Sequence, residues 1–510
     1  MLRIDKLSLY MKKDLRYLVK DFSFVPGEKR NKIALIGEEG NGKSTLLKAI
    51  YDPRLITDYV EITGEINHGG EVIGYLPQQI SETDARKSTE EILVQEIAWE
   101  NIDYTELNKL LFDFELNSEI ISPELNFGQL SGGEKIKYQL ILQLLKRPTL
   151  LLLDEPSNDL DLASIGFLED FIKNSKLKII FVSHDERLLE NCSDTIVHFE
   201  QLVHKSRAVH TVASLNYKEY VRQRSAKIER QSKMAFKERE EFNAQMERYR
   251  KIYERVQHEL RSVSRQEPEV ARNLKDKMHT VKSIGRRFEK QEAKLTVKPI
   301  VEDAISIGFK AASDIHTKKA LLAYETAELK AGPKILSRNI RLELCGPEKI
   351  CIVGANGSGK TTLLREIHAE LKNLNLSSAY MPQEYGEGMD MSKSPIDFLT
   401  RDYSKEEHTR IRTYLGSLKF TPEEMLRPIA ELSGGQKAKL YFAKMILHDA
   451  EVLVLDEPTR NLSPLSGPEI REALLKFTGA IIAVSHDRAF IDEVFDKVYE
   501  LRMDGLQLID

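Results

Sequence analysis

The stretch that decides the fold occurs twice, as "GEEGNGKST" at residues 37–45 and as "GANGSGKTT" at residues 354–362. Each copy follows an apolar run, "KIALIG" or "KICIVG", and precedes a helix-like pattern, "STLLKAI" or "TTLLREI". The alternative is a glycine turn without a ligand. The order strand, loop, helix and the pattern G-x-x-x-x-G-K-[ST] instead predict a phosphate-binding P-loop, because glycines let successive backbone N–H groups point at phosphate oxygens.

The P-loop motif assigns a role to each of its polar side chains. Lys43 and Lys360 are expected to place a positive charge on the outer phosphates, and Ser44 and Thr361 are expected to bind Mg²⁺. The residues expected to surround the phosphates are Gly37, Gly40, Asn41, Gly42, Lys43, Ser44 and Thr45 in the first loop, and Gly354, Asn356, Gly357, Ser358, Gly359, Lys360, Thr361 and Thr362 in the second.

Four further motifs repeat in the same order, so the chain contains an internal duplication. They are "YLPQQ" at 75–79 and "YMPQE" at 380–384, "LSGGE" at 130–134 and "LSGGQ" at 432–436, "LLLLDEPSNDLD" at 150–161 and "VLVLDEPTRNLS" at 452–463, and "FVSHD" at 181–185 and "AVSHD" at 483–487. Ser131 precedes Asp154 by 23 residues, and Ser433 precedes Asp456 by the same 23. Chance does not keep five motifs in this order and register.

The carboxylates that end two apolar runs are the candidate catalytic groups. "LLLLDE" and "VLVLDE" predict buried parallel strands, and the carboxyl end of such a strand is where an open α/β sheet places its ligands. An Asp-Glu pair alone is more often a cap or a solvated turn, but the P-loop in the same repeat favours chemistry. We expect Asp154 and Asp456 to hold Mg²⁺, and Glu155 and Glu457 to polarise the attacking water. Gln78 and Gln383, which reach both metal and water, and His184 and His486, near the γ-phosphate, complete the catalytic set.

These motifs together resemble those of the ATP-binding cassette ATPases, in which "LSGGE" and "LSGGQ" correspond to the signature loop. The resemblance implies an α/β fold with two P-loop cassettes, ATP and Mg²⁺ as ligands, and hydrolysis of ATP to ADP and phosphate. It also implies that the signature loop of one cassette closes on the nucleotide of the other. We call the two expected composite sites site one (Lys43, Ser44, Gln78, Asp154, Glu155 and His184 with Ser433, Gly434 and Gly435) and site two (Lys360, Thr361, Gln383, Asp456, Glu457 and His486 with Ser131, Gly132 and Gly133). Tyr10 is a candidate to stack on the adenine.

A basic segment separates the repeats. Residues 216–298 contain 23 Lys and Arg against 13 Asp and Glu, whereas the rest of the chain contains 52 against 67. A local excess of positive charge in an acidic protein predicts a surface for a polyanion. We therefore expect cassette 1 over residues 1–215, a helical hairpin over 216–298 with its tip near 264–269, and cassette 2 over 299–510.

Two apolar seams support the hairpin. Phe242, Met246, Tyr249, Tyr253, Val256, Leu260 and Val263 alternate spacings of four and three residues, as do Leu274, Met278, Val281, Gly285 and Phe288. Off the second seam lie Arg272, Lys275, Lys277, Lys282, Arg286, Arg287, Lys290 and Lys294. A solvated face that mixes charges is the alternative, but acidic residues are few here, which favours contacts with RNA phosphates.

Twin cassettes with a basic hairpin and without a membrane-spanning run resemble the ABC-F proteins, which act on ribosomes. This resemblance implies a cytoplasmic monomer that binds the 70S ribosome, with 23S rRNA, the tRNA exit site and the P-site tRNA as contacts of the hairpin. The hairpin would approach the peptidyl-transferase centre and displace bound antibiotics. No room exists for an inserted arm between Gln78 and Ser131, which favours antibiotic resistance over the alternative of a housekeeping translation factor. An ATP-switched clamp on another nucleic acid and a transporter motor subunit are the further alternatives.

The chain departs from the motif pattern at four positions. Glu38 and Glu39 stand in the first P-loop where Ala355 and Asn356 stand in the second. Arg460 and Ser463 replace the residues found at 158 and 161 of the first repeat. Because acid beside a triphosphate is unfavourable, and because the loop with Ser463 faces the first P-loop in the family, we expect both departures to affect site one and to make it the slower site.

Overall fold

The computed structural model describes residues 1–158, 160–202, 207–262, 268–292, 295–296, 320–418, 420–447, 450–460 and 462–509. Its contacts form two compact units, one of Met1–Lys218 with Glu302–Asp510 and one of Glu219–Val301. Both cassettes therefore belong to the same unit, and the greater part of the helical segment between them forms the other.

Cassette 1 is built on two sheets. A three-stranded antiparallel sheet has the order β2-β1-β4, and a six-stranded sheet has the order β5-β6-β7-β3-β8-β9, in which only β9 runs antiparallel to its neighbour. The strands are β1 (Arg3–Met11), β2 (Tyr17–Phe24), β3 (Lys32–Ile36), β4 (Val60–Asn67), β5 (Ile73–Leu76), β6 (Leu150–Asp154), β7 (Lys178–Val182), β8 (Thr195–Gln201) and β9 (Arg207–Ala213).

The helices of cassette 1 cover these sheets. They are α1 (Lys43–Tyr51), α2 (Glu82–Ala85), α3 (Thr89–Glu96), α4 (Tyr104–Asp113), α5 (Gly132–Leu145), α6 (Leu162–Asn174) and α7 (Glu186–Cys192). Every residue of β3 and β6 is buried, and helix α1 packs its Leu46, Leu47 and Ile50 into the same core. The continuous apolar runs in the sequence thus correspond to strands buried on both faces.

Cassette 2 repeats this architecture. Its six-stranded sheet has the order β13-β14-β15-β12-β16-β17, and β10 pairs with β11 in a separate ribbon. The strands are β10 (Ala320–Ala331), β11 (Lys334–Cys345), β12 (Lys349–Val353), β13 (Ser378–Met381), β14 (Val452–Asp456), β15 (Ala480–Val484), β16 (Lys497–Arg502) and β17 (Gly505–Leu508). The helices are α11 (Lys360–Asn373), α12 (Pro395–Leu399), α13 (Lys405–Ser417), α14 (Gly434–Leu447), α15 (Gly467–Leu475) and α16 (Arg488–Val494).

The shared strand order brings the repeated motifs to equivalent places in the two cassettes. In both sheets the strand before the P-loop (β3 or β12) lies two positions from the strand that ends in Asp-Glu (β6 or β14), with β7 or β15 between them. Because these strands are parallel, their carboxyl ends lie at one edge, and the P-loop, the carboxylates and the histidine come together there. The expected fold, two α/β cassettes joined by a helical segment, is confirmed.

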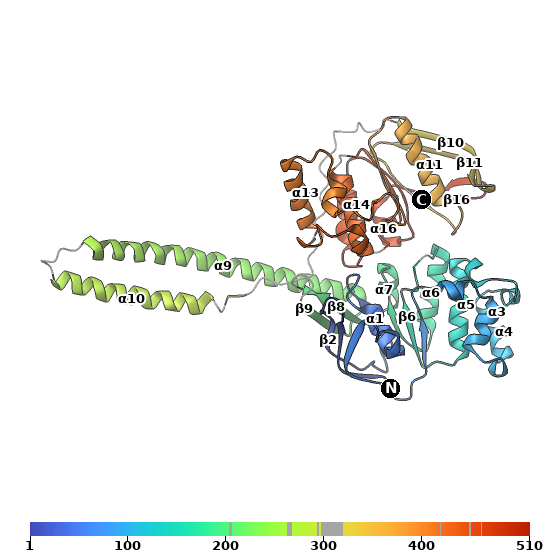
Figure 1. The fold of residues 1–510 in the computed structure, drawn as a ribbon, viewed down its shortest axis with the longest axis horizontal. Coiled ribbons are helices and arrows are strands. Elements are labelled where there is room, and N and C mark those ends of the chain that lie inside the picture. Colours follow the sequence, from blue (N-terminus) through green and yellow to red (C-terminus); the bar gives the residue numbers. More distant parts are fainter. Residues whose placement is uncertain are drawn as a thin grey trace. The chain divides into compact units, whose positions relative to one another are not determined.

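The helical segment contains two helices that lie side by side, α9 (Tyr217–Ser262) and α10 (Pro268–Glu292) (Figure 1). The Phe288 ring lies 6.1 Å from the Phe242 ring and 5.5 Å from the Tyr249 ring, so the two seams face each other. A Cβ added at Gly285 would lie 2.4 Å from the Tyr249 hydroxyl, which explains glycine at that seam position. The expected tip near 264–269 and Lys294 lie largely outside the described residues, as do the side chains of Glu269 and Lys290.

No helix in the described part of the chain combines the length and the apolar character that crossing a bilayer requires.

Candidate functional site

The two P-loops adopt the backbone conformation that their glycines predict. Gly40 and Gly42 have φ of 79° and 88°, and Gly357 and Gly359 have φ of 79° and 101°, all in the left-handed region that favours glycine. A Cβ at Gly42 would also lie 2.8 Å from Leu18 Cβ. Helices α1 and α11 begin directly after these loops, so each loop carries the N-terminus of a helix, where backbone N–H groups are available to an anion.

The P-loop lysines are buried beneath their own loops. Lys43 Nζ donates to the carbonyl oxygens of Gly37 at 2.8 Å and Glu38 at 3.0 Å, and Lys360 Nζ donates to those of Gly354 at 2.8 Å and Ala355 at 3.0 Å. Burial lowers the pKa of Lys360. A buried ammonium group beneath a glycine-rich loop at the start of a helix fits a phosphate group.

The residues expected to bind Mg²⁺ lie together at the sheet edge. Ser44 Oγ donates to Asp154 Oδ1 at 2.8 Å, and Tyr75 donates to Asp154 Oδ2 at 3.2 Å. Burial raises the pKa of Asp154 to about 6 and also raises that of Asp456. Asp456 Oδ2 is buried and accepts no hydrogen bond from any described residue. Buried carboxylate and hydroxyl oxygens are the hard ligands that Mg²⁺ prefers, so the residues fit the ion.

Glu155 is surrounded by hydrogen-bond donors. Gln78 Nε2 donates to its Oε2 at 2.8 Å, Asn158 Nδ2 donates to the same oxygen at 2.5 Å, and His184 Nε2 lies 3.1 Å from Oε1. Burial alone would raise the pKa of Glu155, but the charge and hydrogen bond of His184, together with Lys43 and Asn158, lower it to about 2. The expected neighbours Gln78 and His184 thus lie beside Glu155, whereas Asn158 was not expected there, and the catalytic roles stay predictions.

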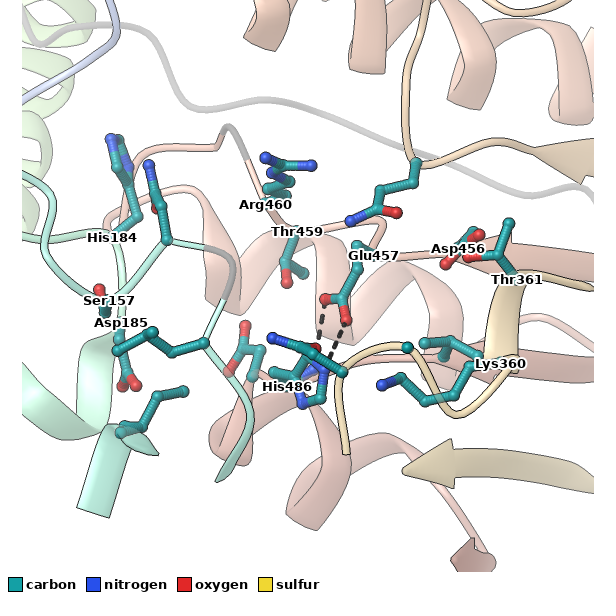
Figure 2. A pocket seen from close by; sticks show the side chains of 18 of the residues that line it. Ser157, His184, Asp185, Lys360, Thr361, Asp456, Glu457, Thr459, Arg460 and His486 are labelled. Carbon is teal, nitrogen blue, oxygen red and sulfur yellow. Dashed lines mark hydrogen bonds and ion pairs between the residues drawn. The ribbon is translucent and has the colours of Figure 1, made fainter. Parts of the chain in front are cut away.

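Glu457, at the equivalent position, has a different environment (Figure 2). The backbone N–H of His486 donates to its Oε2 at 3.2 Å, whereas Oε1 lies 3.6 Å from His486 Nε2 and has no hydrogen-bond partner among the described residues. Burial, followed by the charge of Asp456, raises the pKa of Glu457 to about 8. Burial and the charge of Lys360 lower the pKa of His486 to about 4.

Glu457 lines a cavity of about 340 Å³ that is formed by both cassettes. Cassette 2 contributes the P-loop with Lys360 and Thr361, and also Gln383, Asp456 and His486; cassette 1 contributes residues that follow β6 and β7, among them Ser157, Asn158, Leu160, His184 and Asp185. Arg460 lines this same cavity. Its expected placement at site one is therefore wrong: Arg460 lies at the cavity of the second P-loop, where its charge acts on Glu457. The later part of the same loop, residues 462–466, reaches cassette 1.

That later part of the loop contacts cassette 1 at two places. The carbonyl oxygen of Leu462 lies 2.7 Å from His184 Nδ1, and Ser466 Oγ donates to Glu38 Oε1 at 3.4 Å. The expected proximity of this loop to the first P-loop thus holds for its residues 462–466, and Ser463 is buried among them.

The two signature loops begin their helices in the same way. Ser131 Oγ accepts from the N–H of Glu134, whose carboxylate accepts the N–H of Ser131, and Ser433 and Gln436 form the same reciprocal pair. Sequence reasoning did not assign a role to the last residue of "LSGGE" and "LSGGQ", although a serine followed three positions later by Glu or Gln is the signature of a capping box.

The signature loops differ in what they contact. The backbone N–H of Gly435 donates to Glu39 Oε2 at 2.6 Å, and Lys439 Nζ, one turn further along α14, lies 3.7 Å from Glu38 Oε2. The signature loop of cassette 2 thus meets the P-loop of cassette 1, as expected for site one. Ser131 is exposed, and Ser131 and Gly133 line a separate cavity of about 580 Å³ to which no described residue of the second P-loop contributes.

Several candidate ligands make structural contacts. Asn41 Nδ2 donates to the Phe199 carbonyl oxygen at 3.0 Å and is buried, so it anchors the P-loop to β8. Ser358 stands at the equivalent position of the second P-loop, and its Oγ is buried without a hydrogen-bond partner among the described residues. The Tyr10 ring packs edge-on against the Tyr17 ring at 5.0 Å, and Tyr17 is a second aromatic candidate that sequence reasoning missed because it considered a single position.

Comparison with known proteins gives the same classification as the geometry. The sequence profile of the family described as ABC transporter matches residues 21–158 and 337–460. The putative ATP-binding protein YdiF of Bacillus subtilis is 29% identical over 92% of this chain and 76% of its own length. The ribosome protection protein VmlR of the same species is 28% identical over 93% and 82%. ABC transporter F family member 2 of Arabidopsis thaliana is 27% identical over 94% and 74%.

Solved structures show the same fold. A structure described as the complex of archaeal ribosomal stalk protein aP1 and archaeal ribosome recycling factor aABCE1 superposes with a TM-score of 0.60 at 17% identity, covering 99% of this chain and 90% of the other. The RNase-L inhibitor superposes with a TM-score of 0.58 at 18% identity, covering 98% and 90%. At this identity the likeness concerns the fold alone.

Proposed function

The chain belongs to the ABC transporter family, whose ATP-binding domain it contains twice, and from this premise we propose that it is an ABC-F protein that couples ATP hydrolysis to action on the ribosome. The chain is an ATPase by its family. The ribosome is proposed as its partner because VmlR, a ribosome protection protein, aligns with 93% of this chain. That alignment is the observation that carries the proposal.

We assign the ATPase roles to the residues gathered at the two sheet edges. Lys43 and Lys360, with the backbone N–H groups of their loops, hold the phosphates, and Glu155 and Glu457 accept the proton of the attacking water. Gln78 and Gln383 orient that water, and His184 and His486 contact the γ-phosphate. Ser44 and Thr361, with Asp154 and Asp456, hold Mg²⁺, which supplies positive charge to the phosphate oxygens when it is bound.

ATP acts as a bridge between the cassettes in this proposal. The contact of the Gly435 N–H with the first P-loop supports it, because that N–H lies at the N-terminus of α14 and is able to serve a phosphate oxygen as it serves the Glu39 carboxylate. Hydrolysis removes the terminal phosphate and lets the halves separate, which changes how the hairpin is held.

The charge of the hairpin supports an RNA partner. On α10 the side chains of Arg272, Lys275, Lys277, Lys282, Arg286 and Arg287 are exposed, and none forms an ion pair with another described residue. On α9, by contrast, acidic neighbours one turn away pair with Arg222, Lys233, Lys237, Arg250 and Lys251. Cations without acidic partners are free to contact phosphates, and such contacts position a protein without reading sequence.

The finer proposal follows the ABC-F resemblance. The protein acts in the cytoplasm as a monomer, its hairpin enters the tRNA exit site of the 70S ribosome, and it contacts 23S rRNA and the P-site tRNA. From there it reaches toward the peptidyl-transferase centre and displaces antibiotics bound near it. A housekeeping role in translation is the second candidate, since the chain aligns with ABC transporter F family member 2 over 94% of its length as well as with VmlR.

Co-sedimentation tests the partner. The Glu155→Gln/Glu457→Gln double variant, saturated with ATP, is expected to migrate with ribosomes. Adding Lys275→Gln, Lys277→Gln and Lys282→Gln is expected to weaken this binding and to reduce its salt dependence, because three phosphate contacts are lost. The matched control replaces the paired cations Lys233, Arg250 and Lys251 by Gln and is expected to bind nearly as the parent does. Migration with DNA or membranes but not with ribosomes contradicts the proposal.

Growth measurements separate the two roles. A sensitive bacterium that expresses the chain is expected to tolerate higher concentrations of drugs that bind near the peptidyl-transferase centre, and tolerance is expected to disappear with the double variant. Ribosome binding without tolerance across a panel of ribosome-targeting drugs would favour the housekeeping role.

A further inference from the structure

Two ion pairs between the cassettes involve residues that are equivalent in the internal repeat, with an acid in cassette 1 wherever cassette 2 has an arginine. Equivalent residues from the signature loop onward differ by 302 positions, as for Ser131 and Ser433, Glu155 and Glu457, and His184 and His486. By this register Glu169 on α6 corresponds to Arg471 on α15, and Glu186 on α7 corresponds to Arg488 on α16. Cassette 1 thus carries an acid at both positions, and cassette 2 carries an arginine at both.

Each acid contacts the arginine at the other position of the partner cassette. Arg471 donates from Nη1 to Glu186 Oε1 at 2.9 Å and from Nη2 to Oε2 at 3.0 Å, which is a bidentate pair. Arg488 Nη1 lies 2.8 Å from Glu169 Oε2. The internal repeat relates the two contacts to each other: each joins the α6 or α15 position of one cassette to the α7 or α16 position of the other, as in an interface with two-fold symmetry.

The pair of Arg471 with Glu186 is largely buried in the interface, whereas in the second pair the Arg488 side chain is 27% exposed and that of Glu169 is 11% exposed. The Arg471 side chain is 4% exposed and that of Glu186 is 13% exposed. A Cβ added at Gly467 would lie 2.2 Å from Glu186 Oε1, so the glycine leaves the space that the first pair occupies. A partly buried arginine that loses its acid is costly, and a like charge in its place costs more.

Other charged groups surround the two pairs, and a further ion pair, Arg187 Nη2 with Asp492 Oδ2 at 2.9 Å, also joins the cassettes without the exchange of charge. Glu493 accepts from Arg471 Nε at 2.7 Å, and Asp185 Oδ2 lies 3.6 Å from Arg488 Nη2. Glu169 Oε1 also accepts from Lys173 and Asn191. Burial opposes the ionisation of Glu169, but the hydrogen bond from Lys173 and the charge of Arg488 lower its pKa.

We propose that these two exchanged pairs, Glu169 with Arg488 and Glu186 with Arg471, select the partner of each cassette: they favour pairing of cassette 1 with cassette 2 and oppose pairing of like cassettes from two copies of the chain. If two copies of cassette 1 met in this geometry, Glu169 would face Glu186 twice. If two copies of cassette 2 met, Arg471 would face Arg488 twice. Specificity of this kind rests on repulsion in the wrong complex as well as attraction in the right one.

This role is separate from the proposed action on ribosomes, because it concerns how the two halves of an ATPase recognise each other. A P-loop and a signature motif are present in both halves, so the motifs alone do not distinguish the correct pairing from a pairing of like halves. The exchanged charges do distinguish them.

Charge reversal in the full chain tests the proposal. The all-arginine variant (Glu169→Arg/Glu186→Arg) and the all-glutamate variant (Arg471→Glu/Arg488→Glu) each place like charges at both contacts. We expect each to lose ATP turnover by about tenfold or more, since one decade corresponds to about 1.4 kcal/mol and like charges at an interface cost at least that. The fourfold variant, which combines all four changes, restores opposite charges and is expected to recover turnover as a single-chain species.

Mixing supplies an outcome that a general loss of folding would not produce. Each double variant alone is expected to have the mass of one chain in light scattering, whereas an equimolar mixture is expected to form a two-chain complex with partly recovered turnover. The proposal is overturned if the double variants keep their turnover, if the fourfold variant fails to recover it, or if the mixture stays at the mass of one chain. No arm of the test contains ribosomes, so its failure is distinguishable from failure of the proposed function.

Discussion

Site one and site two contain the same motifs, yet the glutamates proposed as their general bases have opposite surroundings. Glu155 receives hydrogen bonds from Gln78 and Asn158 and lies beside His184, and its pKa is about 2. Glu457 has one carboxylate oxygen without a hydrogen-bond partner among the described residues, and burial raises its pKa to about 8. Identical sequence motifs thus do not fix the state of the group they contain; the donors around it do.

The difference has a consequence for catalysis. A general base works best when its pKa lies near the working pH and its lone pair is available to the water. Glu155 is a weak base with its oxygens already occupied, whereas Glu457 is a stronger base with an available oxygen. In addition, Glu38 and Glu39 lie in the first P-loop and contact cassette 2, which places negative charge where site one would receive a triphosphate. Both observations favour site two as the faster site.

The largest expected effect separates the two glutamates directly. Glu457→Gln should reduce steady-state ATP turnover by about 100-fold or more, approaching the double variant, because removal of a general base costs 10²- to 10⁴-fold. Glu155→Gln should reduce it by less than about tenfold by the same reasoning, since site one carries the smaller share. Phosphate release measured at saturating ATP gives both values. Equal losses would contradict the inequality of the sites.

A second difference concerns stability against pH in the protein without nucleotide and metal. The pKa of Glu155 is lowered to about 2, so the ionised carboxylate stabilises the fold above about pH 4.5, and this stabilisation is lost as the pH falls toward 2. Glu155→Gln should therefore lower the free energy of unfolding by about 3 kcal/mol at neutral pH. The pKa of Glu457 is raised to about 8, so its stabilising effect is present below about pH 4.5 and is lost as pH rises through 8.

The two substitutions should consequently shift the melting temperature in opposite directions on the alkaline side. Glu457→Gln should melt higher than the wild type at pH 8.5 and close to it at pH 5, whereas Glu155→Gln should melt lower at both. Calorimetry across this pH range is the measurement. A Glu457→Gln protein that melts lower than the wild type at pH 8.5 would show that the carboxylate has a charge-stabilising partner.

A third comparison exchanges the P-loop acids. Glu38→Ala/Glu39→Asn gives the first loop the residues of the second and removes two charges near the phosphates. We expect ATP to bind site one about tenfold more tightly, which corresponds to about 1.4 kcal/mol, because carboxylates repel the triphosphate. The reciprocal Ala355→Glu/Asn356→Glu protein should bind ATP more weakly at site two. Titration with a fluorescent nucleotide in each background, with the other site blocked at Lys43 or Lys360, measures the two affinities.

The sequence alone predicted the two P-loops, the carboxylates at the strand ends and the resemblance to ATP-binding cassette ATPases. The resemblance is confirmed by the family match. Each of these depends on neighbours within one repeat, where spacing along the chain fixes spacing in the sheet. The directions of Glu38 and Glu39 could not be predicted in the same way, because they depend on Lys439 and Ser466 of the other cassette. Arg460 was placed at the wrong site for a related reason. Residues of one loop reach both sites, and which residue reaches which site depends on packing between the cassettes rather than on spacing along the chain.

The smallest expected effect concerns the residues that follow the two glutamates by three positions. Asn158→Ala removes the hydrogen bond to Glu155 Oε2 and should cost about 1 kcal/mol or less in stability, with little change in total ATP turnover, because site one contributes little to it. Arg460→Ala removes a positive charge that lowers the pKa of Glu457, so the pKa of that carboxyl should rise and its basic form should become scarcer at neutral pH. Turnover should therefore fall more in Arg460→Ala than in Asn158→Ala, and the fall should diminish at higher pH, where Glu457 is ionised in both proteins. A pH profile of turnover for the two variants measures this, and a larger loss in Asn158→Ala would reverse the assignment of the faster site.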